Sequence, residues 1–259
     1  CTVINVQGRK SRGRTADEIE CAIRENFKHG IKQYFITDDN FSRHRNWEEI
    51  LDRIILLREK ERIKIRFIIQ VDTACHRIPR FIEKAAKAGC SKVFIGLENI
   101  NPESLKGTGK KQNHIEDYKE MLMAWRRAGV ITCAGYIIGF PDDTYESFMK
   151  DLEIIKHELP IDLMEFFILT PLPGSEDHRR LYVDRVWMDP DLNRYDTEHA
   201  IIRHKKMSKE EWVKAYQSAW ESFYSPEHIE TIFKRAGASK LSLGKLTGQV
   251  LWFYGSIKY

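Results

Sequence analysis

The stretch from His114 to Ile138 reads HIEDYKEMLMAWRRAGVITCAGYII and contains both elements from which the fold is built. In its first half the apolar residues recur at helical spacing, and Gly129 is the residue type that most often follows a helix end. Its second half is almost continuously apolar, as in a strand that helices cover. The sequence therefore predicts a helix over 114–128 and a buried strand over 130–138.

The same order of helix and then strand recurs along the chain. Thr15 predicts the start of the first helix, because Glu18 stands where a capping box needs it. Such alternation is typical of parallel strands joined by right-handed crossovers, in a (β/α) barrel or a doubly wound sheet. The other predicted pairs are 15–28 with 31–37, 47–60 with 63–71, 77–88 with 92–97, and 145–158 with 163–170.

The chain opens in a loop and a helix, so we expect a further strand to precede Cys1. With that strand the fold class is α/β, a partial (β/α)6 TIM-like barrel whose first strand is missing from this sequence. Beyond Pro173 the sequence becomes polar and aromatic-rich, with one clear helix over 209–223. We therefore expect a barrel core over 1–174 and a mainly helical or irregular C-terminal extension over 175–259.

Composition narrows the class of protein. The 259 residues are 42% hydrophobic and 31% charged, which is typical of a globular protein. The formal net charge of +4 does not indicate nucleic-acid binding. No apolar run is long enough to span a bilayer and no signal peptide is recognisable, so a cytoplasmic location is expected. The five cysteines lack disulfide-scaffold or Cys-x-x-Cys spacing, which favours reduced thiols.

Polar residues follow every predicted strand, at the end where parallel α/β folds bind ligands. Helix capping would explain such residues at one strand end, but is a weaker explanation for all five. These residues are Asp38, Asp39 and Asn40, then Gln70 and Asp72, then Glu98 and Asn99, then 139–144 (GFPDDT) and finally 170–175 (TPLPGS).

Five segments in register resemble the core of the radical S-adenosylmethionine (radical SAM) superfamily. More narrowly, they resemble the branch that often carries an N-terminal cobalamin-binding domain. The segments are Cys1 with the basic loop behind it, DDNF at 38–41, VFIGLENINPESLKGTGKKQN at 93–113, GYIIGFPDDT at 135–144 and ILTPLPGS at 168–175.

The resemblance implies a [4Fe-4S] cluster whose fourth iron binds SAM. In the family three cysteines in a Cys-x-x-x-Cys-x-x-Cys loop bind the other irons. Cys1 matches the last of these cysteines, and the first two are absent from the sequence. We therefore expect them upstream of Cys1, and we expect residues 1–259 alone neither to assemble the cluster nor to cleave SAM.

The resemblance also assigns residues to SAM. Asp38, Asp39 and Asn40 match the position that accepts hydrogen bonds from the SAM ammonium group. Gln70 and Glu98 are further polar contacts. Lys110 matches a basic position facing the SAM carboxylate, although Lys111 could serve instead. The residues expected against adenine, each of which could also be barrel core, are Tyr136, Ile138, Leu169, Thr170 and Pro171.

By resemblance the function is reductive cleavage of SAM to a 5′-deoxyadenosyl radical, for cobalamin-dependent methyl transfer or oxidative cyclisation. The partners would be a small-molecule substrate, hydrophobic or tetrapyrrole-like, and an electron donor. The alternatives are a noncatalytic barrel that binds a nucleotide or a partner, an iron-free phosphate-binding barrel, and methylthiolation of tRNA. Two loop pairs could also act, Arg43 with His44 near the substrate and Cys75 with His76 as metal ligands.

Overall fold

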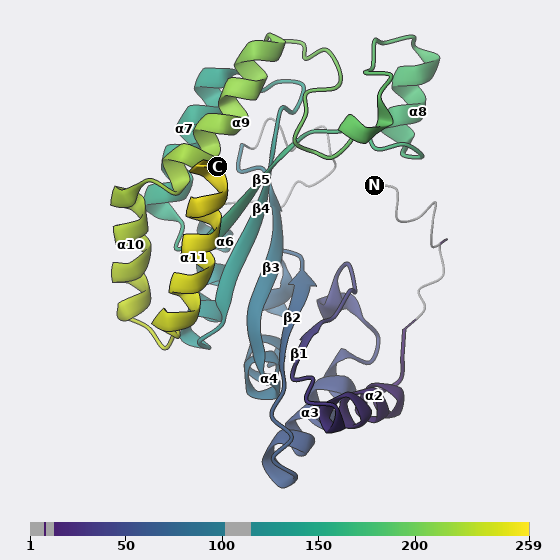
Figure 1. The fold of residues 1–259 in the computed structure, drawn as a ribbon, viewed down its shortest axis with the longest axis vertical. Helices are drawn as coiled ribbons and strands as arrows, with labels where there is room; N and C mark the ends of the chain where they lie inside the picture. The colour runs from purple at the N-terminus through teal and green to yellow at the C-terminus, as the bar shows by residue number, and fades with distance from the viewer. Residues whose placement is uncertain (1–7, 9–12, 102–114, 259) are drawn as a thin grey trace.

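The computed structural model describes residue 8, residues 13–101 and residues 115–258. Five parallel strands form one sheet in sequence order, and the sheet curls into a half-barrel (Figure 1). This confirms the predicted α/β class and partial barrel. The strands are β1 (Gln33–Phe35), β2 (Arg66–Val71), β3 (Cys90–Glu98), β4 (Ile131–Ile138) and β5 (Leu163–Ile168).

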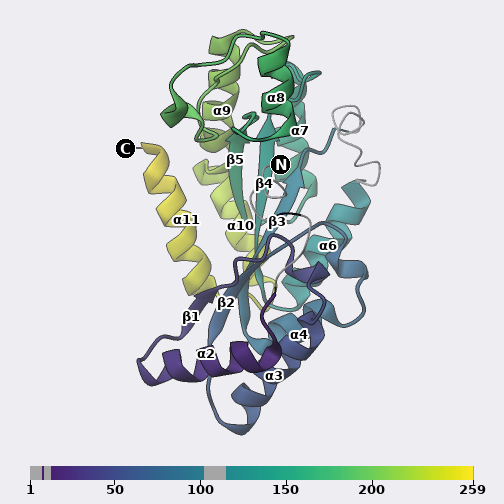
Figure 2. The ribbon, with the colours of Figure 1, turned by 90° about the vertical axis from the view of Figure 1, so that its right-hand side faces the viewer.

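The helices of the barrel part cover one side of the sheet (Figure 2). α4 packs on β3, α6 on β4 and α9 on β5, while α3 packs on α4 and α2 on α3. Thr15 and Glu18 form the predicted capping box at the start of α2. The helices within the barrel part are α2 (Ala16–Lys28), α3 (Trp47–Lys60), α4 (Phe81–Ala88), α6 (Ile115–Arg127) and α7 (Tyr145–Glu158), with short 3-10 turns η1 (Phe41–Arg43) and η2 (Cys75–Arg77).

One helix begins later than the sequence pattern indicates. We expected a helix over 77–88, but α4 starts at Phe81 and a 3-10 turn precedes it. Pro79 disfavours helical geometry at the residue before it, and Arg80 has a left-handed φ of 64°. Together they separate the turn from the helix.

Alternation along the strands gives the sheet two distinct faces. In β2, Phe67, Ile69 and Val71 are buried, whereas Ile68 and Gln70 between them are only half-buried. The buried set faces the helices, and we call this the outer face. The other set lines the inside of the half-barrel, which we call the concave face. Two faces with different burial are expected when helices cover only one side.

The C-terminal part is helical and packs on the barrel, as predicted. Its segments are α8 (Glu176–Val183), η3 (Leu192–Arg194), α9 (Lys209–Phe223), α10 (Pro226–Gly237) and α11 (Leu243–Lys258). The Tyr224 hydroxyl donates to the Met164 carbonyl at 2.8 Å and accepts from its N–H at 3.1 Å, which blocks part of the open edge of β5. Among the described helices, none is long and apolar enough to cross a membrane.

Candidate functional site

The carboxyl ends of all five strands meet at one edge of the half-barrel, which we call the mouth. Because the strands are parallel, Asp39, Glu98 and Thr170 come from loops or strand ends at this same edge. Cys1 and Lys110 lie outside the described residues. The predicted site residues Asp39, Glu98 and Thr170 therefore lie at the same edge of the sheet.

The loops after β1 and β2 are tied together by Asn40. Its Oδ1 accepts from the Ser42 hydroxyl at 2.7 Å and from the Asp72 N–H at 3.4 Å. Asp38 accepts from the Asn40 N–H at 3.1 Å, while Asp39 is exposed. Asn40 thus holds the loop in shape, and Asp39 is the carboxylate of this group that is most open to a ligand.

Glu98 ends β3 in a strained backbone geometry, with a φ of 67°. The pairing of β3 with β4 shifts register at Gly96 and Glu98. Gly96 lies on the concave face, and a Cβ built on it would stand 3.0 Å from the Glu98 carboxylate. The Glu98 side chain therefore folds back over the concave face, on the side where Gln70 of β2 also lies.

Two aromatic rings cover Gly135 on the concave face. A Cβ at Gly135 would meet Phe94 at 2.8 Å and Phe167 at 3.2 Å, so only glycine lets both rings approach the strand. Alternation then places Ile137, which is half-buried, on the concave face next to Phe167, its partner in β5. Ile137 is an apolar residue at the mouth that the sequence interpretation passed over.

Tyr136 and Ile138 point the other way. The Tyr136 hydroxyl donates to Asp151 of α7 at 3.1 Å, and its ring packs against Phe148 of the same helix. Both Tyr136 and Ile138 are fully buried on the outer face. Their side chains face the helices and not the concave face, and contact of these two residues with adenine stays a prediction. The alternation of neighbours with Gly135 was the signal that could have selected Ile137 instead.

Burial is the main cause of the raised pKa values of Tyr136 and Asp151. The pKa of Tyr136 is raised by its burial and by the neighbouring carboxylates Asp151 and Asp143. Burial raises the pKa of Asp151 to about 6, although the hydrogen bond from Tyr136 lowers it and Asp143 adds to the increase. Tyr136 and Asp151 therefore join β4 to α7 on the outer side of the sheet.

The loop at 139–144 is fixed by its own carboxylate. Asp143 is buried and accepts from the N–H groups of Gly139 at 3.1 Å and Phe140 at 2.9 Å. Thr144 then caps α7 through the Ser147 N–H. These bonds hold the backbone after β4 in one conformation, so a ligand at the mouth would meet a preformed loop.

Two residues of the C-terminal part, Trp212 and His204, bind the backbone around the loop at 139–144. The Trp212 indole N–H donates to the Ile138 carbonyl at 3.0 Å, and its ring fills the space that a Cβ at Gly139 would need, 2.2 Å away. His204 accepts two backbone N–H groups at Nδ1, so its Nε2 carries the proton and donates to the Phe140 carbonyl at 2.8 Å. Residues beyond 175 therefore position a loop of the barrel.

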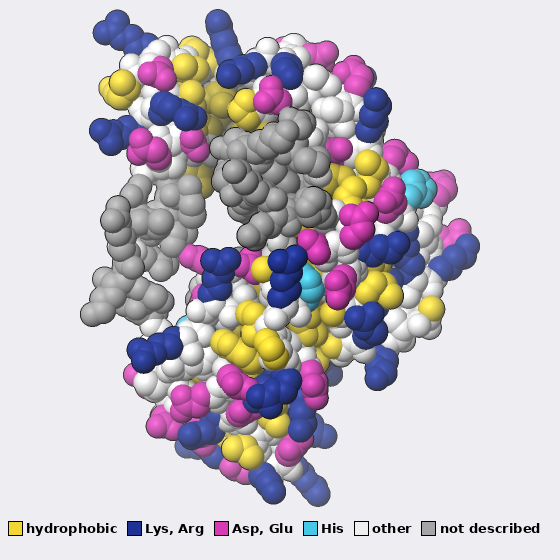
Figure 3. All heavy atoms as spheres, turned by 180° about the vertical axis from the view of Figure 1, so that it is seen from behind, with side chains coloured by type: hydrophobic (Ala, Val, Ile, Leu, Met, Phe, Trp, Pro, Cys, Tyr) yellow, Lys and Arg dark blue, Asp and Glu magenta, His cyan; other side chains and the backbone are white. Residues whose placement is uncertain are grey.

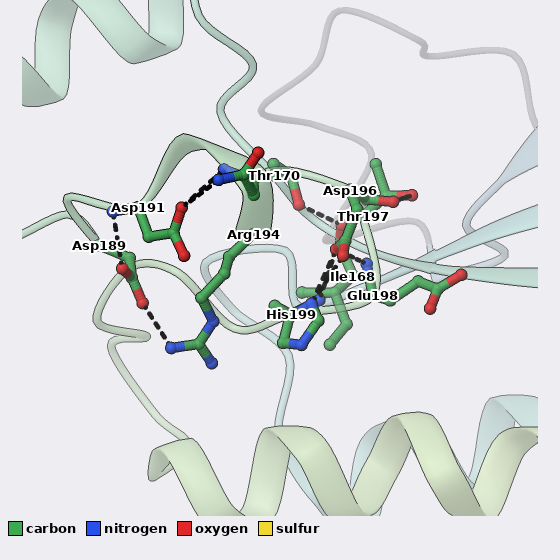
Figure 4. A network of polar contacts seen from close by, with 10 residues as sticks. Ile168, Thr170, Asp189, Asp191, Arg194, Asp196, Thr197, Glu198 and His199 are labelled. Carbon is green, nitrogen blue, oxygen red and sulfur yellow. Dashed lines mark hydrogen bonds and ion pairs between the residues drawn. The ribbon is translucent and has the colours of Figure 1, made fainter.

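The end of β5 lies beside the segment at 189–199 (Figure 4). The Ile168 N–H donates to the Thr197 carbonyl at 2.6 Å, and the Thr170 hydroxyl donates to the Ile168 carbonyl at 3.0 Å. Asp189 pairs with Arg194 at 2.8 Å and shapes the segment. Leu169 is half-buried and bonds to β4 through its N–H, while Pro171 is buried. These residues lie at the mouth, but their described polar contacts are structural.

The described cysteines do not make a cluster site. Cys21 is exposed on α2, whereas Cys75, Cys90 and Cys133 are buried in different elements. Burial raises the pKa of Cys75 to about 12 and raises those of Cys90 and Cys133 as well, which disfavours the thiolate that iron requires. Within the described ranges no group of three or more His, Cys, Asp or Glu residues could hold a metal ion.

The two loop pairs singled out in the sequence have structural contacts. Arg43 forms an ion pair with Asp72 at 2.6 Å, and His44 accepts from the Asn46 N–H at 3.1 Å. His76 contacts the Thr73 carbonyl at 3.0 Å. Cys75, fully buried beside it, belongs to no candidate metal site in the described part of the chain.

Comparison with protein families identifies the chain. A family model described as the radical SAM superfamily matches residues 1–155. The chain belongs to the radical SAM superfamily. The curated relatives are methyltransferases by name, and this chain spans about half of their length.

Two relatives and one solved structure illustrate the similarity. An uncharacterised methyltransferase of Pyrococcus horikoshii is 29% identical over 89% of this chain and 50% of its own length. The bacteriochlorophyllide d C-12(1)-methyltransferase of Chlorobaculum tepidum is 27% identical over 88% of this chain and 49% of its own. The radical SAM methyltransferase TsrM of Kitasatospora setae, solved with cobalamin and a [4Fe-4S] cluster, shares the fold with a TM-score of 0.53, at 22% identity over 65% of this chain and 33% of that one.

Proposed function

We propose that this radical SAM protein binds SAM at the mouth of the half-barrel and cleaves it reductively, for cobalamin-dependent methyl transfer or oxidative cyclisation of a small molecule. The supporting observation is the mouth itself: the exposed Asp39, the strained Glu98 and a loop locked by Asp143 converge on one strand edge. Preformed polar groups of this kind bind a charged ligand with little reorganisation.

Each group has a proposed role. The carboxylates of Asp38 and Asp39 would accept hydrogen bonds from the SAM ammonium group, in a loop held by Asn40. Gln70 and Glu98 would add polar contacts from the concave face. For adenine we propose Ile137 together with the backbone at 138–140 and the end of β5 at 169–171. Lys110, outside the described residues, remains a proposed partner of the SAM carboxylate.

We propose that the cluster ligands are Cys1 and two cysteines upstream of it, because the described cysteines do not fit an iron site. The chemistry that a bound [4Fe-4S] cluster supplies is one-electron reduction of SAM, giving methionine and a 5′-deoxyadenosyl radical. The role of this chain would be to bind and orient SAM and to exclude water from the mouth.

The proposal also includes a substrate, cobalamin and an electron donor. The tetrapyrrole methyltransferase among the relatives supports a hydrophobic or tetrapyrrole-like substrate. Cobalamin would be held by a separate domain, and an electron donor would be required. The protein is proposed to work in the cytoplasm and without nucleic acid.

The test is SAM binding by the cluster-loaded full-length protein with Asp39→Ala. Loss of a charge-assisted hydrogen bond costs about 1.5–3 kcal/mol, so the Kd for SAM should rise about 10- to 150-fold. Calorimetry measures the affinity, and chromatography measures the 5′-deoxyadenosine produced. Glu49→Ala, an exposed carboxylate on α3, is the matched control and should change neither.

An unchanged Kd and turnover in Asp39→Ala would remove this loop from the site. If the loaded parent protein bound SAM but released no 5′-deoxyadenosine under reducing conditions, the noncatalytic alternative would replace the enzymatic one.

A further inference from the structure

A cleft runs between the concave face and α11, from the starts of the first strands to Phe167 and to Glu198 of the segment at 189–199. It consists of two cavities of about 660 and 620 Å³ that share Lys92, Gly248 and Gln249 in their walls. α11 begins near β1 and slopes past the sheet (Figure 2). A Cβ added at Gly244 or Gly248 would meet nothing within 4 Å, so this face of the helix leaves space towards the sheet.

The cavity near the strand starts is cationic. Arg66, Lys92 and Lys245 line it, and no acidic residue does. None of the three makes a side-chain hydrogen bond or an ion pair with another described residue. The pKa of Lys245 is lowered by burial and by the neighbouring Arg66, as expected for cations held together without a counter-charge.

The cavity beside β5 is aromatic. Phe166 and Phe167 line it from the strand, Tyr216 and Trp220 from α9, and Trp252 and Phe253 from α11. Its acidic residues are Glu165, which accepts from the Cys133 thiol at 3.2 Å, and Glu198. Rings from three elements on one cavity suit a bulky apolar group.

One buried polar atom between the two cavities has no partner. Gln249 Oε1 is inaccessible to solvent and accepts no hydrogen bond from any described residue. Buried amide oxygens are nearly always satisfied, and an exception calls for an explanation. A polar group of a ligand that crosses from one cavity to the other would satisfy it.

We propose that this cleft binds an apolar molecule that carries one carboxylate or phosphate group. The anionic end lies among Arg66, Lys92 and Lys245, and the apolar body lies against the rings of β5, α9 and α11. The arrangement follows from charge: Arg66 and Lys245 line only the cationic cavity, these rings and both acids line only the aromatic cavity, and Lys92 lies where the two cavities join. The proposal does not depend on SAM chemistry.

The test uses calorimetric titration of the full-length protein with dodecanoate, dodecyl phosphate, dodecanol and inorganic phosphate, each below its micelle concentration. One or both amphiphilic anions should bind at one site, at least about tenfold more tightly than dodecanol or inorganic phosphate, because only they use both halves of the cleft. Binding of one anion but not the other identifies the head group.

Two exposed residues give variants that should fold. Lys245→Gln should weaken binding of the anions about tenfold and leave dodecanol unchanged. Trp252→Ala, whose side chain is 66% exposed, should weaken all three amphiphiles. Lys209→Gln, an exposed lysine at the start of α9, is the control and should change nothing. Absence of saturable binding, equal binding of inorganic phosphate, or binding that ignores Lys245→Gln would overturn the proposal.

Discussion

Charged side chains are paired differently on the helix-covered outer side and on the concave side of the sheet. Among the helices, Lys84 pairs with Asp52 at 2.5 Å and with Glu48 at 3.0 Å. Figure 3 shows basic and acidic side chains interspersed over the face opposite to that of Figure 1. In the cleft, Arg66 and Lys245 have no such partner among the described residues. The charges of Lys84, Asp52 and Glu48 are thus paired within the fold, whereas Arg66 and Lys245 have no acidic partner among the described residues.

The contrast extends to uncharged groups. Outer-face residues such as Tyr136 are buried and hydrogen-bonded to the next helix. On the concave face, the side chains of Glu98, Phe94 and Phe167 fold over the glycines at 96 and 135, on the side of the sheet that no described helix of the barrel part covers. We therefore expect changes on the outer side to affect stability and changes on the concave side to affect binding.

The largest expected loss of stability is on the outer side, at a buried ion pair. Asp162 is fully buried, pairs with Arg126 of α6 and accepts from the Thr132 N–H at 2.9 Å and hydroxyl at 2.8 Å. Asp162→Ala leaves the Arg126 charge buried without a partner, which typically costs about 3–5 kcal/mol. Urea unfolding should measure this loss, while SAM affinity per folded molecule stays constant.

A paired replacement checks the cause. Arg126→Met combined with Asp162→Leu removes both charges and should restore most of the lost free energy. If the double variant were as unstable as Asp162→Ala, the Thr132 bonds would account for the effect and the ion pair would not.

The next effect tests the link between the two sides. Trp212→Phe removes the indole N–H that bonds to the Ile138 carbonyl and leaves a small void at Gly139. We expect a stability loss of about 1–3 kcal/mol and, unlike for Asp162, weaker SAM binding, because the loop at 139–144 loses its outer support. Trp187→Phe, a half-exposed indole, is the control. A loss of stability with unchanged SAM affinity would mean that Trp212 of α9 does not influence SAM binding.

A smaller effect depends on pH. The pKa of Asp151 is about 6 in the folded protein and 3.8 as the ordinary value, because of burial, with Tyr136 and Asp143 facing it. The folded state then holds a proton that the unfolded state has released, so stability falls as pH rises from about 4 to about 6 and is level above that. Asp151→Asn should remove this fall and be more stable by about 1–2 kcal/mol at pH 7. Thermal unfolding across this pH range measures it, and parallel curves would contradict the assignment.

Much of the fold could be predicted because its signals are local. Thr15 and Glu18 mark the start of α2, and Gly129, with a φ of 76°, ends the helix before β4. The five apolar runs specify the five strands, since helix-covered parallel strands need nothing else. The late start of α4 has one signal in the sequence, Pro79, which disfavours helical geometry at the residue before it, whereas the left-handed geometry of Arg80 leaves no pattern in a non-glycine residue.

The site could be predicted less well, because which face a residue occupies depends on register. The sequence placed Tyr136 and Ile138 at the strand end correctly but could not say that they face α7. Nor could it place Trp212, whose contact with Ile138 spans 74 residues. The cleft beside α11 is a further case, since Lys92 and Lys245 line one cavity only in the folded chain.

The smallest expected effect compares one lysine from each side. Lys84→Gln breaks a partly buried contact with Asp52 and Glu48 and should cost about 0.5–1 kcal/mol in urea unfolding. Lys245→Gln removes a cation that has a neighbouring cation and no acid, so it should be neutral or stabilising by up to about 0.5 kcal/mol. Added salt should reduce the difference between the two variants, because it screens attraction and repulsion alike. Equal destabilisation by both substitutions would mean that Lys245 has a partner in the folded protein, and the two sides would then not differ in the way that their described contacts indicate.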